Sequence, residues 1–414
     1  MELFLSQKSI PEGTRRTIRL VNPDVQPEIE IFFDLIGETP PEPQVLDGFV
    51  SAIIFYAMRL GQPLRVHGPL TKDALCNLHE FQEAWVRWKP HVYRKVEVIP
   101  SEIVMPEIGV DRRAIAAFSG GVDSVFTIMR HNRDHLGNAS YPLRHSVLMV
   151  HGFDIPLSSP DQLVLLKERT KPLLDDLNLK LLTIRTNLKE ANLQDWEDSF
   201  MAQLACCLHN YSHNFYYALV GSSEPYDGLV LPWGSNPTTD HLLSGGTMRL
   251  VHDGAGFSRT EKVAYIANDR TASRVLKVCW EGKETHKNCG VCEKCIRTQA
   301  NFLAAGMTRP ACFDAPIDLR RIKTIRLRNA CQCAELESIV AYAKANAMTG
   351  EWLRWLQARV KAFKSPIRRR FGTAARRTQT LLMMLARGEV GEVAAEIARW
   401  RTGVLHLAAK PTKR

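Results

Sequence analysis

The sequence predicts an α/β protein whose core is an open, mostly parallel β-sheet. Three short apolar segments, residues 114–118, 146–151 and 180–185, carry almost no charge and are separated by stretches of helical periodicity. Parallel strands with helices on both faces of the sheet have this composition. Two further segments, residues 218–222 and 274–279, are predicted as the fourth and fifth strands.

The chain of 414 residues is long enough for two or three domains. Residues 1–110 alternate strand-like and helical segments and predict a small α+β domain without a catalytic constellation. Residues 112–310 make up the α/β domain, and residues 320–414 a helical, basic region. Within the first region the predicted strands are 17–21, 29–35, 64–67 and 95–99, and the predicted helices are 44–60 and 71–88.

The composition excludes several classes of protein. Ten cysteines are too few and too unevenly spaced for a secreted disulfide framework. No stretch reaches the roughly 18 apolar residues of a membrane span, and the first residues lack the pattern of a secretory signal. We therefore expect a globular protein of the reducing cytoplasm.

The net charge of +10 is concentrated near the C-terminus. Residues 354–414 contain 15 Lys/Arg and three Asp/Glu, a net of +12, which leaves a net of −2 for the first 353 residues. Such a basic tail can attract nucleic acid or anionic lipid. It can equally be a solvated helical surface or pack on the body or on a second subunit of a homodimer, and we favour these interpretations.

The clearest motif joins the first strand of the α/β region to the next helix, and it consists of Ser119, Gly120, Gly121, Val122, Asp123 and Ser124. In this position, backbone N–H groups and the positive end of the helix dipole face one point, where an anion can bind. Glycines let the main chain approach phosphate closely. The serine hydroxyls add donors, and Asp123 can cap N–H groups or help to hold Mg²⁺. A plain strand-to-helix turn is the alternative, but the complete hexapeptide favours an anion site.

A second motif consists of four cysteines with nine, two and two residues between them: Cys279, Cys289, Cys292 and Cys295. Thiolates this close together repel each other and oxidise unless a metal holds them, and four such ligands suit tetrahedral zinc. A closed four-sulfur shell has no open coordination position, so we expect a structural site. An iron–sulfur cluster is the alternative.

The hexapeptide Ser119–Ser124 resembles the pyrophosphate loop of the PP-loop ATP pyrophosphatases, the adenine nucleotide α-hydrolases. The loop together with the cysteine motif resembles the 7-cyano-7-deazaguanine synthase family over about residues 112–310. The resemblance implies a Rossmann-like fold that binds ATP and Mg²⁺, cleaves ATP between the α and β phosphates, and carries a zinc knuckle. It implies that the four cysteines hold the zinc, with Arg297 just beyond them.

The chain also departs from the synthase pattern. After the second strand, the synthase has a Tyr-Gly-Gln-type segment, whereas this chain has the sequence His-Gly-Phe-Asp at 151–154. In place of the synthase's substrate segments, this chain has residues 221–227 and 233–240. The regions 1–110 and 320–414 lie outside the resemblance. The chain is therefore identified as a divergent relative, in which ATP use is better supported than the deazaguanine substrate.

Other polar residues are candidates for contact with substrate or magnesium. Two carboxylates follow predicted strand ends, the edge at which open α/β sheets bind ligands. Two polar loops at 234–241 and 249–254 are expected to form a lid or a substrate wall, in which histidine and aspartate can transfer protons. The third strand ends on an arginine that can contact phosphate or form an ordinary ion pair. These candidates are Asp154, Arg185, Glu224, Asp240, His252 and Asp253.

Three functions remain open from the sequence. The first, which we favour, is an ATP-dependent ligase-type enzyme that adenylates a substrate carboxylate, releases pyrophosphate and AMP, and uses ammonia or an amine as nucleophile. The second is a PP-loop enzyme that modifies a nucleic-acid base, with the basic tail as its arm, although no cysteine lies near the loop in sequence for thiolation. The third is a non-catalytic nucleotide-binding protein that serves a partner.

Overall fold

The computed structural model describes residues 1–22, 25–106, 112–133, 136–279, 281–282, 284 and 286–365. The chain separates into two compact units, Met1–Leu353 and Arg354–Arg414. The predicted helices of the basic tail, beyond residue 365, lie outside the described residues, as do residues 107–111 at the boundary between the first two predicted regions. Among the helices that the structure describes, none has both the length and the apolar character needed to cross a bilayer.

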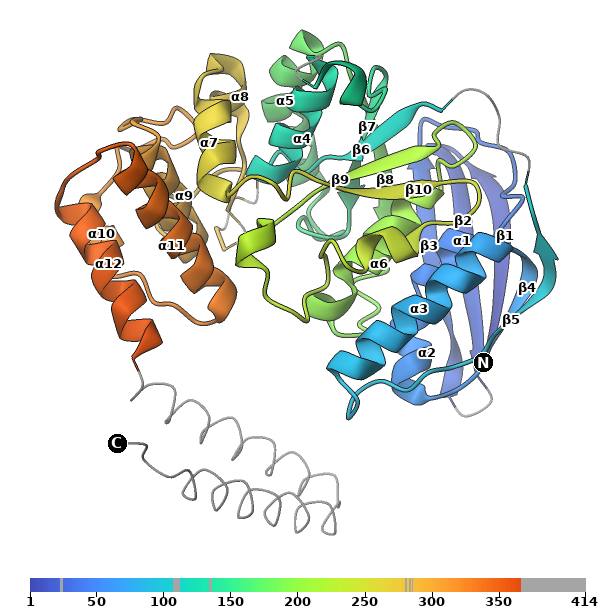
Figure 1. Ribbon diagram of the computed structural model, residues 1–414. Helices are drawn as coiled ribbons and strands as arrows, with labels where there is room; N and C mark the ends of the chain where they lie inside the picture. The colour runs from blue at the N-terminus through green and yellow to red at the C-terminus, as the bar shows by residue number, and fades with distance from the viewer. Residues whose placement is uncertain are drawn as a thin grey trace, which may run out of the picture. The chain divides into compact units, whose positions relative to one another are not determined.

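Ten strands form one sheet in the order β10-β9-β6-β7-β8-β3-β2-β1-β4-β5 (Figure 1). Six of the nine neighbouring pairs that the structure describes are parallel, which confirms the predicted α/β class with a mostly parallel sheet. The strands are β1 Glu2–Ile10, β2 Gly13–Asn22, β3 Val25–Ile36, β4 Leu64–Thr71, β5 Val98–Val104, β6 Ala114–Ala117, β7 Ser146–His151, β8 Lys180–Thr186, β9 Tyr217–Gly221 and β10 Arg249–Asp253.

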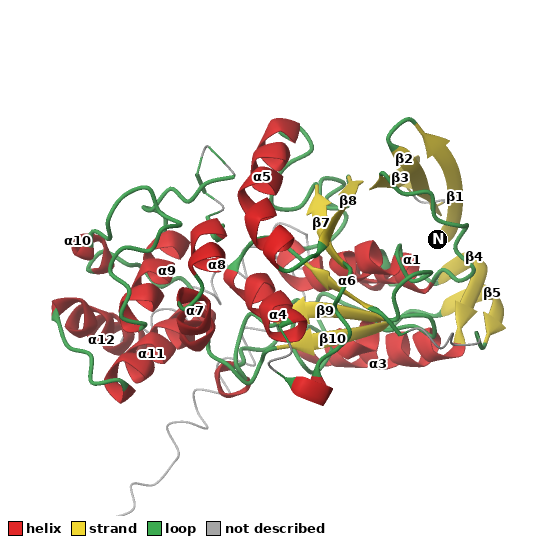
Figure 2. Cartoon of the chain, turned by 90° about the horizontal axis from the view of Figure 1, so that it is seen from above, coloured by secondary structure: helices red, strands yellow, loops and turns green. Residues whose placement is uncertain are grey.

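Helices cover both faces of the sheet. They are α1 Asp47–Ser51, α2 Ile54–Leu60, α3 Lys72–Trp88, α4 Val122–Asn132, α5 Pro160–Asp176, α6 Trp196–His209, α7 Arg259–Ala267, α8 Arg270–Val275, α9 Glu293–Ala304, α10 Leu319–Ile322, α11 Ala330–Ala345 and α12 Glu351–Lys364. Short 3-10 turns occupy η1 Gly137–Ala139, η2 Tyr226–Gly228 and η3 Asp240–Leu243. The view in Figure 2 places β7 and β9 between α4 and α5 on one side and α6 on the other.

Both faces of the central strand β6 are buried, as its apolar sequence predicts. Ile115 packs into a core shared with α1, α2, α3 and α6. Its neighbours Ala114 and Ala116 point to the opposite face and pack into a core shared with α4, α5, α7, α8 and α9. Successive side chains of a strand point to opposite faces, so a strand that is covered on both sides has no room for polar residues.

The parallel part of the sheet has the order β8-β7-β6-β9-β10. From β6 the chain moves outward through β7 and β8, and it then returns to the other side of β6 to form β9 and β10. Connections that leave the carboxyl ends of β6 and β9 therefore run in opposite directions. Open α/β sheets bind ligands at such a switch point, and the loop of the hexapeptide lies there.

The strands of residues 1–106 extend the same sheet. β1, β2 and β3 pair in antiparallel fashion, and β3 pairs with β8 over four residues. Side chains of these strands share one core with α6. The sequence did not predict β1, it placed β5 about three residues early, and its first helix is divided into α1 and α2.

The predicted fifth strand is wrong. Residues 274–279 comprise the end of α8 and a segment that pairs with no strand in the structure as described. The side chain of Asp269 caps α8 by accepting a hydrogen bond from the N–H of Ala272 at 2.7 Å, which favours a helix over the strand that the apolar run suggested. The fifth parallel strand is β10, which was predicted as a polar loop; as an edge strand it has fewer buried positions than a central one.

Candidate functional site

A glycine corner joins β6 to α4. The N–H of Phe118 still donates to the carbonyl of Leu148 at 2.8 Å, and the chain then turns through Gly120 with φ of +74°. A Cβ atom at Gly120 would lie 3.0 Å from Cγ2 of Thr170, so both conformation and space favour glycine here. The carbonyl of Gly120 accepts the N–H of Lys277 at 2.8 Å, which ties the corner to the segment before the cysteines.

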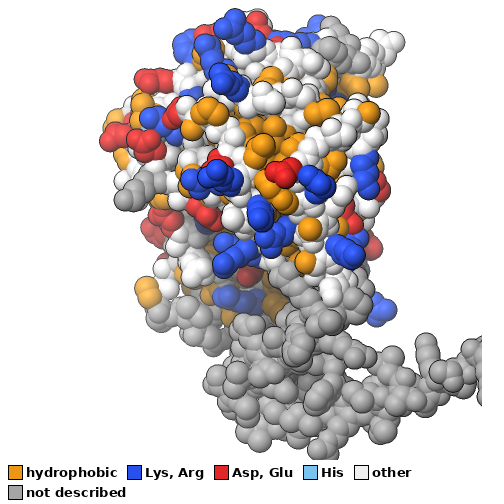
Figure 3. Space-filling model, turned by 90° about the vertical axis from the view of Figure 1, so that its left-hand side faces the viewer, with side chains coloured by type: hydrophobic (Ala, Val, Ile, Leu, Met, Phe, Trp, Pro, Cys, Tyr) orange, Lys and Arg blue, Asp and Glu red, His pale blue; other side chains and the backbone are white. Residues whose placement is uncertain are grey.

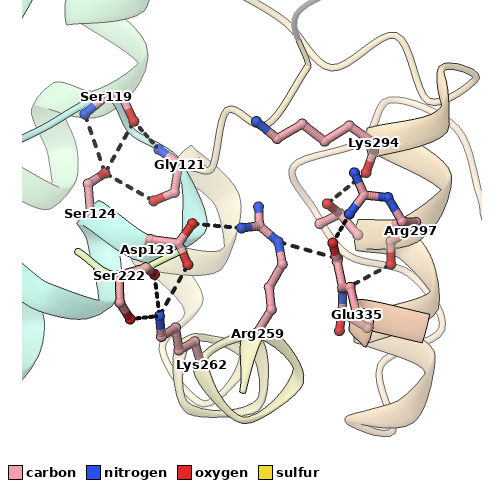
Figure 4. Close-up of polar contacts among 12 residues, drawn as sticks. Ser119, Gly121, Asp123, Ser124, Ser222, Arg259, Lys262, Lys294, Arg297 and Glu335 are labelled. Atoms are coloured by element: carbon pink, nitrogen blue, oxygen red, sulfur yellow. Dashed lines mark hydrogen bonds and ion pairs between the residues drawn. The ribbon is translucent and has the colours of Figure 1, made fainter. Parts of the chain in front are cut away.

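The serines of the loop hold its shape. The Oγ of Ser119 accepts the N–H of Gly121 at 3.3 Å, and the Oγ of Ser124 donates to the carbonyl of Gly121 at 3.1 Å (Figure 4). No side chain caps the N-terminus of α4, whose first N–H groups lack partners within the helix. A polar cavity of 70 Å³ lies against these residues, so the corner has the geometry of an anion-binding site.

Asp123, on the first turn of α4, faces two cations rather than its own helix end. It accepts hydrogen bonds from Arg259 at 2.6 Å and from Lys262 at 3.3 Å, both on α7. Lys262 is 1% exposed and also donates to the carbonyl and hydroxyl of Ser222, at 2.6 and 2.8 Å. Burial favours the protonated form of Asp123, but Arg259 and Lys262 outweigh it and hold the pKa of this carboxyl below its usual value.

A chain of ion pairs connects Asp123 to α11. The guanidinium of Arg259 also lies 3.5 Å from the carboxylate of Glu335, which pairs in turn with Arg297 (Figure 4). Arg297 donates to Glu293 at 2.5 Å on its own helix, α9. Arg297, just beyond the cysteines, is therefore buried in a network that connects it to the loop through Glu335 and Arg259.

Two lysines line the cavities beside the loop. Lys277 and Lys294 line both the small polar cavity and the larger one that adjoins it. Figure 4 shows the side chain of Lys294 extending from α9 toward the loop. Burial, followed by repulsion from Arg259, lowers the pKa of Lys294 to about 8. The loop and the two lysines thus surround one space with donors and positive charge.

The larger cavity has a volume of 410 Å³ and has both polar and aromatic walls. Its polar residues include Ser119, Asp123 and Lys277. Its aromatic residues form a series of neighbouring rings, with 5.1 Å between Phe153 and Trp196, 6.0 Å between Trp196 and Phe200, and 6.0 Å between Phe200 and Trp233. Such a cavity suits a ligand with a flat or apolar part and an anionic part.

The four predicted cysteines come together. The sulfur atoms of Cys279, Cys289, Cys292 and Cys295 all lie within 4.8 Å of one another, a group that could hold a metal ion. Two of the sulfur pairs are separated by 3.8 and 3.9 Å. Tetrahedral zinc with bonds of about 2.3 Å would separate its sulfur ligands by about 3.8 Å. The donor set and its spacing therefore fit zinc.

The cysteine cluster is connected to the cavity at both ends. Cys279 follows Lys277 by two residues, and the side chain of Asn288 accepts the N–H groups of Val278 and Cys279 at 2.8 and 3.2 Å. On the other side, Cys292 is the N-cap of α9, and its sulfur accepts the N–H of Cys295 at 3.4 Å. Lys294 lies between these two cysteines, so the cluster fixes the backbone that carries both lysines.

The structure brings some of the other predicted residues to these cavities. Asp154, after β7, is exposed and lines both the 410 Å³ and the 70 Å³ cavity. Glu224, after β9, lines a third cavity, of 190 Å³, which also touches Asp123. Both residues lie beyond the carboxyl ends of parallel strands, where the sequence placed them.

Three predicted residues form internal networks away from the cavity walls. The Nδ1 of His252 lies 2.8 Å from Asp240, which also accepts the hydroxyl of Ser235, a cavity residue, at 2.7 Å. Asp253 is buried beside α4, where it pairs with His131 at 2.9 Å and accepts the hydroxyl of Thr127 at 2.8 Å. Burial would raise the pKa of Asp253, but His131, Arg130 and Thr127 lower it below its usual value. These contacts are typical of residues that hold β10 and its loop in place.

Arg185, by contrast, is directed toward the N-terminal strands. It pairs with Asp34 of β3 at 2.7 Å, and Asp34 is fully buried and also binds Arg15 at 2.5 Å. The sequence left two roles open for Arg185, a contact with phosphate or an ion pair. The structure shows the ion pair.

Sequence reasoning missed the cations of the site. Arg259 and Lys262 lie on α7, which Ser258 caps, and neither was among the predicted site residues. Lys277 fell inside the incorrectly predicted strand, and Lys294 inside the cysteine motif. Spacing alone does not reveal such residues, because they reach the loop from segments more than 130 positions away.

Comparisons with family models, with curated proteins and with solved structures find no match to this chain. The site is therefore interpreted from its own residues and geometry.

Proposed function

We propose that this protein is an ATP-dependent ligase-type enzyme of the PP-loop kind, which adenylates a substrate carboxylate and releases pyrophosphate. One observation carries the proposal: an uncapped helix N-terminus after a glycine corner and two lysines line adjoining cavities, the larger of which also has aromatic walls. The strand order β8-β7-β6-β9-β10 supports a Rossmann-like, adenine nucleotide α-hydrolase-like arrangement, with the corner at its switch point.

The polar residues of these cavities match the needs of adenylation. The N–H groups of the loop and the amino groups of Lys277 and Lys294 would bind the triphosphate and stabilise the charge that develops on the leaving pyrophosphate. Asp154, exposed in both cavities, is the residue that would hold Mg²⁺, which when bound neutralises phosphate charge, whereas the carboxylate of Asp123 is already paired with Arg259 and Lys262. No covalent intermediate with a protein side chain is required.

The acceptor would pack against the aromatic residues of the larger cavity. Trp196, Phe200 and Trp233 offer ring faces and edges against which a planar molecule can pack. The resemblance to 7-cyano-7-deazaguanine synthase makes a deazaguanine carboxylate the first acid to test. The four-cysteine site would hold zinc in a structural role, because a closed four-sulfur shell leaves no position for substrate.

Isotope exchange tests the proposal directly. Purified protein is incubated with ATP, Mg²⁺, labelled pyrophosphate and a panel of planar aromatic carboxylic acids, and label appearing in ATP reports reversible adenylation. We expect acid-dependent exchange, and AMP release once ammonium is added. A Lys277→Ala, Lys294→Ala variant should lose exchange while keeping its fold. ATP binding without exchange for any acid would instead favour the non-catalytic nucleotide-binding function.

A second candidate, modification of a nucleic-acid base, is favoured by one observation. Five exposed basic residues lie within nine positions at the end of α10 and beyond it: Arg320, Arg321, Lys323, Arg326 and Arg328. Figure 3 shows the side of the molecule that carries α10, on which Lys and Arg lie among acidic and hydrophobic side chains. Salt-dependent binding of RNA or DNA, weakened by replacing three of these residues with glutamine, would support this function.

The structure also bears on thiolation. Cys331 lies in the third cavity, which shares Asp123 with the loop, so a thiol is close in space although none is close in sequence. Burial and the neighbouring Glu224 raise the pKa of Cys331 to about 12. A thiol that stays protonated at neutral pH is a poor nucleophile, so the ligase function remains the better supported of the two.

A further inference from the structure

A separate cavity of 190 Å³ meets the main cavity beside the loop. The residues that line both cavities are Asp123, Ser223, Trp233 and Lys294. The remaining wall of the smaller cavity comes from the segment after β9, from α11, and from Arg259 of α7 and Arg297 of α9. In the proposed function, ATP and the acceptor acid bind in the main cavity. A ligase reaction also has a third reactant, the nucleophile, which needs a separate route to the reacting carbon.

The two arginines and two of the three carboxylates that line this cavity are paired. Arg259 binds Asp123 at 2.6 Å, Arg297 binds Glu293 at 2.5 Å, and Glu335 lies between the two arginines. The carboxylate of Glu224 accepts the N–H of Val230 at 3.1 Å and contacts the thiol of Cys331. Both of these donors are uncharged, and Glu224 forms no ion pair with any residue in the described part of the chain.

A hydroxyl group of the same cavity also lacks a partner. The Oγ of Ser338, on α11, is buried and makes no hydrogen bond within the residues that the structure describes. A buried polar atom without a partner is costly, and such atoms often await a ligand or water. A half-buried carboxylate without a counter-charge and a hydroxyl able to accept a hydrogen bond together suit a small ligand that carries N–H groups and a positive charge.

We propose that this cavity binds the nucleophile of the reaction, ammonium or a small primary amine, with its charged nitrogen at Glu224. The inference rests on the proposed ligase function and adds the location of the second substrate. The volume of 190 Å³ is below the range of about 300–1,000 Å³ that is typical for larger ligands, and it therefore favours a small amine.

The reaction step follows from this placement. The bound ammonium first loses one proton to solvent, and the neutral nitrogen attacks the acyl carbon of the adenylate. A C–N bond forms and the bond from that carbon to the phosphate oxygen breaks, so AMP leaves with the electron pair. The second proton of the nitrogen passes to the Glu224 carboxylate, which acts as general base.

Cys331 offers a test that needs neither ATP nor acceptor. In the full-length protein, Cys331 is labelled with the cationic reagent 2-aminoethyl methanethiosulfonate or with its anionic sulfonatoethyl counterpart. Mass spectrometry follows both Cys331 and the exposed Cys76 of α3, which serves as internal reference. We expect preferential labelling of Cys331 by the cationic reagent relative to Cys76, and a fall of about tenfold in this preference for Glu224→Gln, as the loss of one nearby charge predicts.

The matched control is Asp227→Asn, which removes an exposed carboxylate three residues away that does not line the cavity. It should leave the preference unchanged. Equal preference in wild type and Glu224→Gln would overturn the proposal.

A kinetic test uses ammonium chloride as the nucleophile. Glu224→Gln should raise the KM for ammonium about tenfold in AMP release, whereas the control Asp227→Asn should leave this KM unchanged. An unchanged KM for ammonium refutes the amine site alone. Absence of exchange in wild type refutes the ligase function, and the labelling experiment then still decides whether the cavity selects amines.

Discussion

The two halves of the sheet, β1–β5 and β6–β10, belong to one hydrogen-bonded sheet. They differ in whether residues at their strand ends line the cavities around the loop. Every residue that lines the three cavities around the loop lies between Ala117 and Ser338, and none comes from the strands of the first half. The second half is parallel throughout, so its strands end at one edge and their loops meet there. The first half contains the antiparallel pairs, whose ends alternate between the two edges.

The cavities thus lie on one half of the sheet, although both halves have buried cores. In the first half, Phe33, Phe55 and Trp85 are all fully buried. The second half supplies strand ends with glycines and charged side chains. Changes in the first half should therefore alter the free energy of unfolding, and changes in the second half should alter the affinity for nucleotide.

The largest effect is expected at the junction of the halves. Asp34→Ala leaves Arg15 and Arg185 without their shared buried carboxylate. Removing one partner of a buried ion pair costs about 3–5 kcal/mol, and we expect the lower value because the arginines are about one-third exposed. Urea unfolding measures the loss, and calorimetry should give an ATP affinity within twofold of wild type. A large loss of ATP affinity in the folded variant would break the comparison.

The second effect lies in the parallel half. Lys277→Ala combined with Lys294→Ala removes the amino groups of two lysines that line the cavities beside the loop, and we expect ATP affinity to fall about a hundredfold, from two charge-assisted contacts. Isothermal titration with a non-hydrolysable ATP analogue measures it. The matched control is Lys72→Ala, an exposed lysine of the first half, which should bind as wild type. Equal binding by the double variant would refute the phosphate site.

Metal removal should have a smaller effect. Because the cysteine cluster fixes the backbone around Lys277 and Lys294, extraction of zinc with a thiol reagent and chelator should weaken ATP binding about tenfold, a cost of about 1.4 kcal/mol. Mass spectrometry of the native protein should find one zinc per chain, restored on reconstitution. Cys76→Ser, outside the cluster, should retain its metal. Iron and sulfide in place of zinc would contradict the structural zinc site.

The smallest effect concerns pH. Burial would raise the pKa of Asp34, but its hydrogen bonds to Arg15 and Arg185 hold it below the unfolded value of about 3.9. Its stabilising contribution is therefore complete above about pH 4 and is lost as the pH falls through the lower folded pKa. Unfolding measured between pH 6 and 3 should show a shallower acid loss for Asp34→Asn than for wild type. An identical acid limb would mean that Asp34 is not ionised through these contacts.

Much of the architecture can be predicted from short segments of the sequence. The strands at 114–117, 146–151 and 180–186, the glycine corner and the four cysteines were predicted from short segments, because apolar runs, glycines and closely spaced thiols restrict structure by themselves. The same local logic failed at residues 274–279, where an apolar run follows a capped helix and carries Lys277 to the loop. It failed again at β10, whose polar side chains conceal an edge strand.

The sequence by itself determined the α/β class, the position of the loop and the membership of the cysteine cluster, since each depends on residues that are neighbours in the chain. Only the tertiary structure decided which charges surround Asp123, that Arg185 turns toward Asp34, and that Glu224 and Cys331 share a cavity beside the loop. Those contacts join residues separated by about 100 positions or more. Electrostatic partners at such separations depend on strand order and helix packing, which no local pattern of residues encodes.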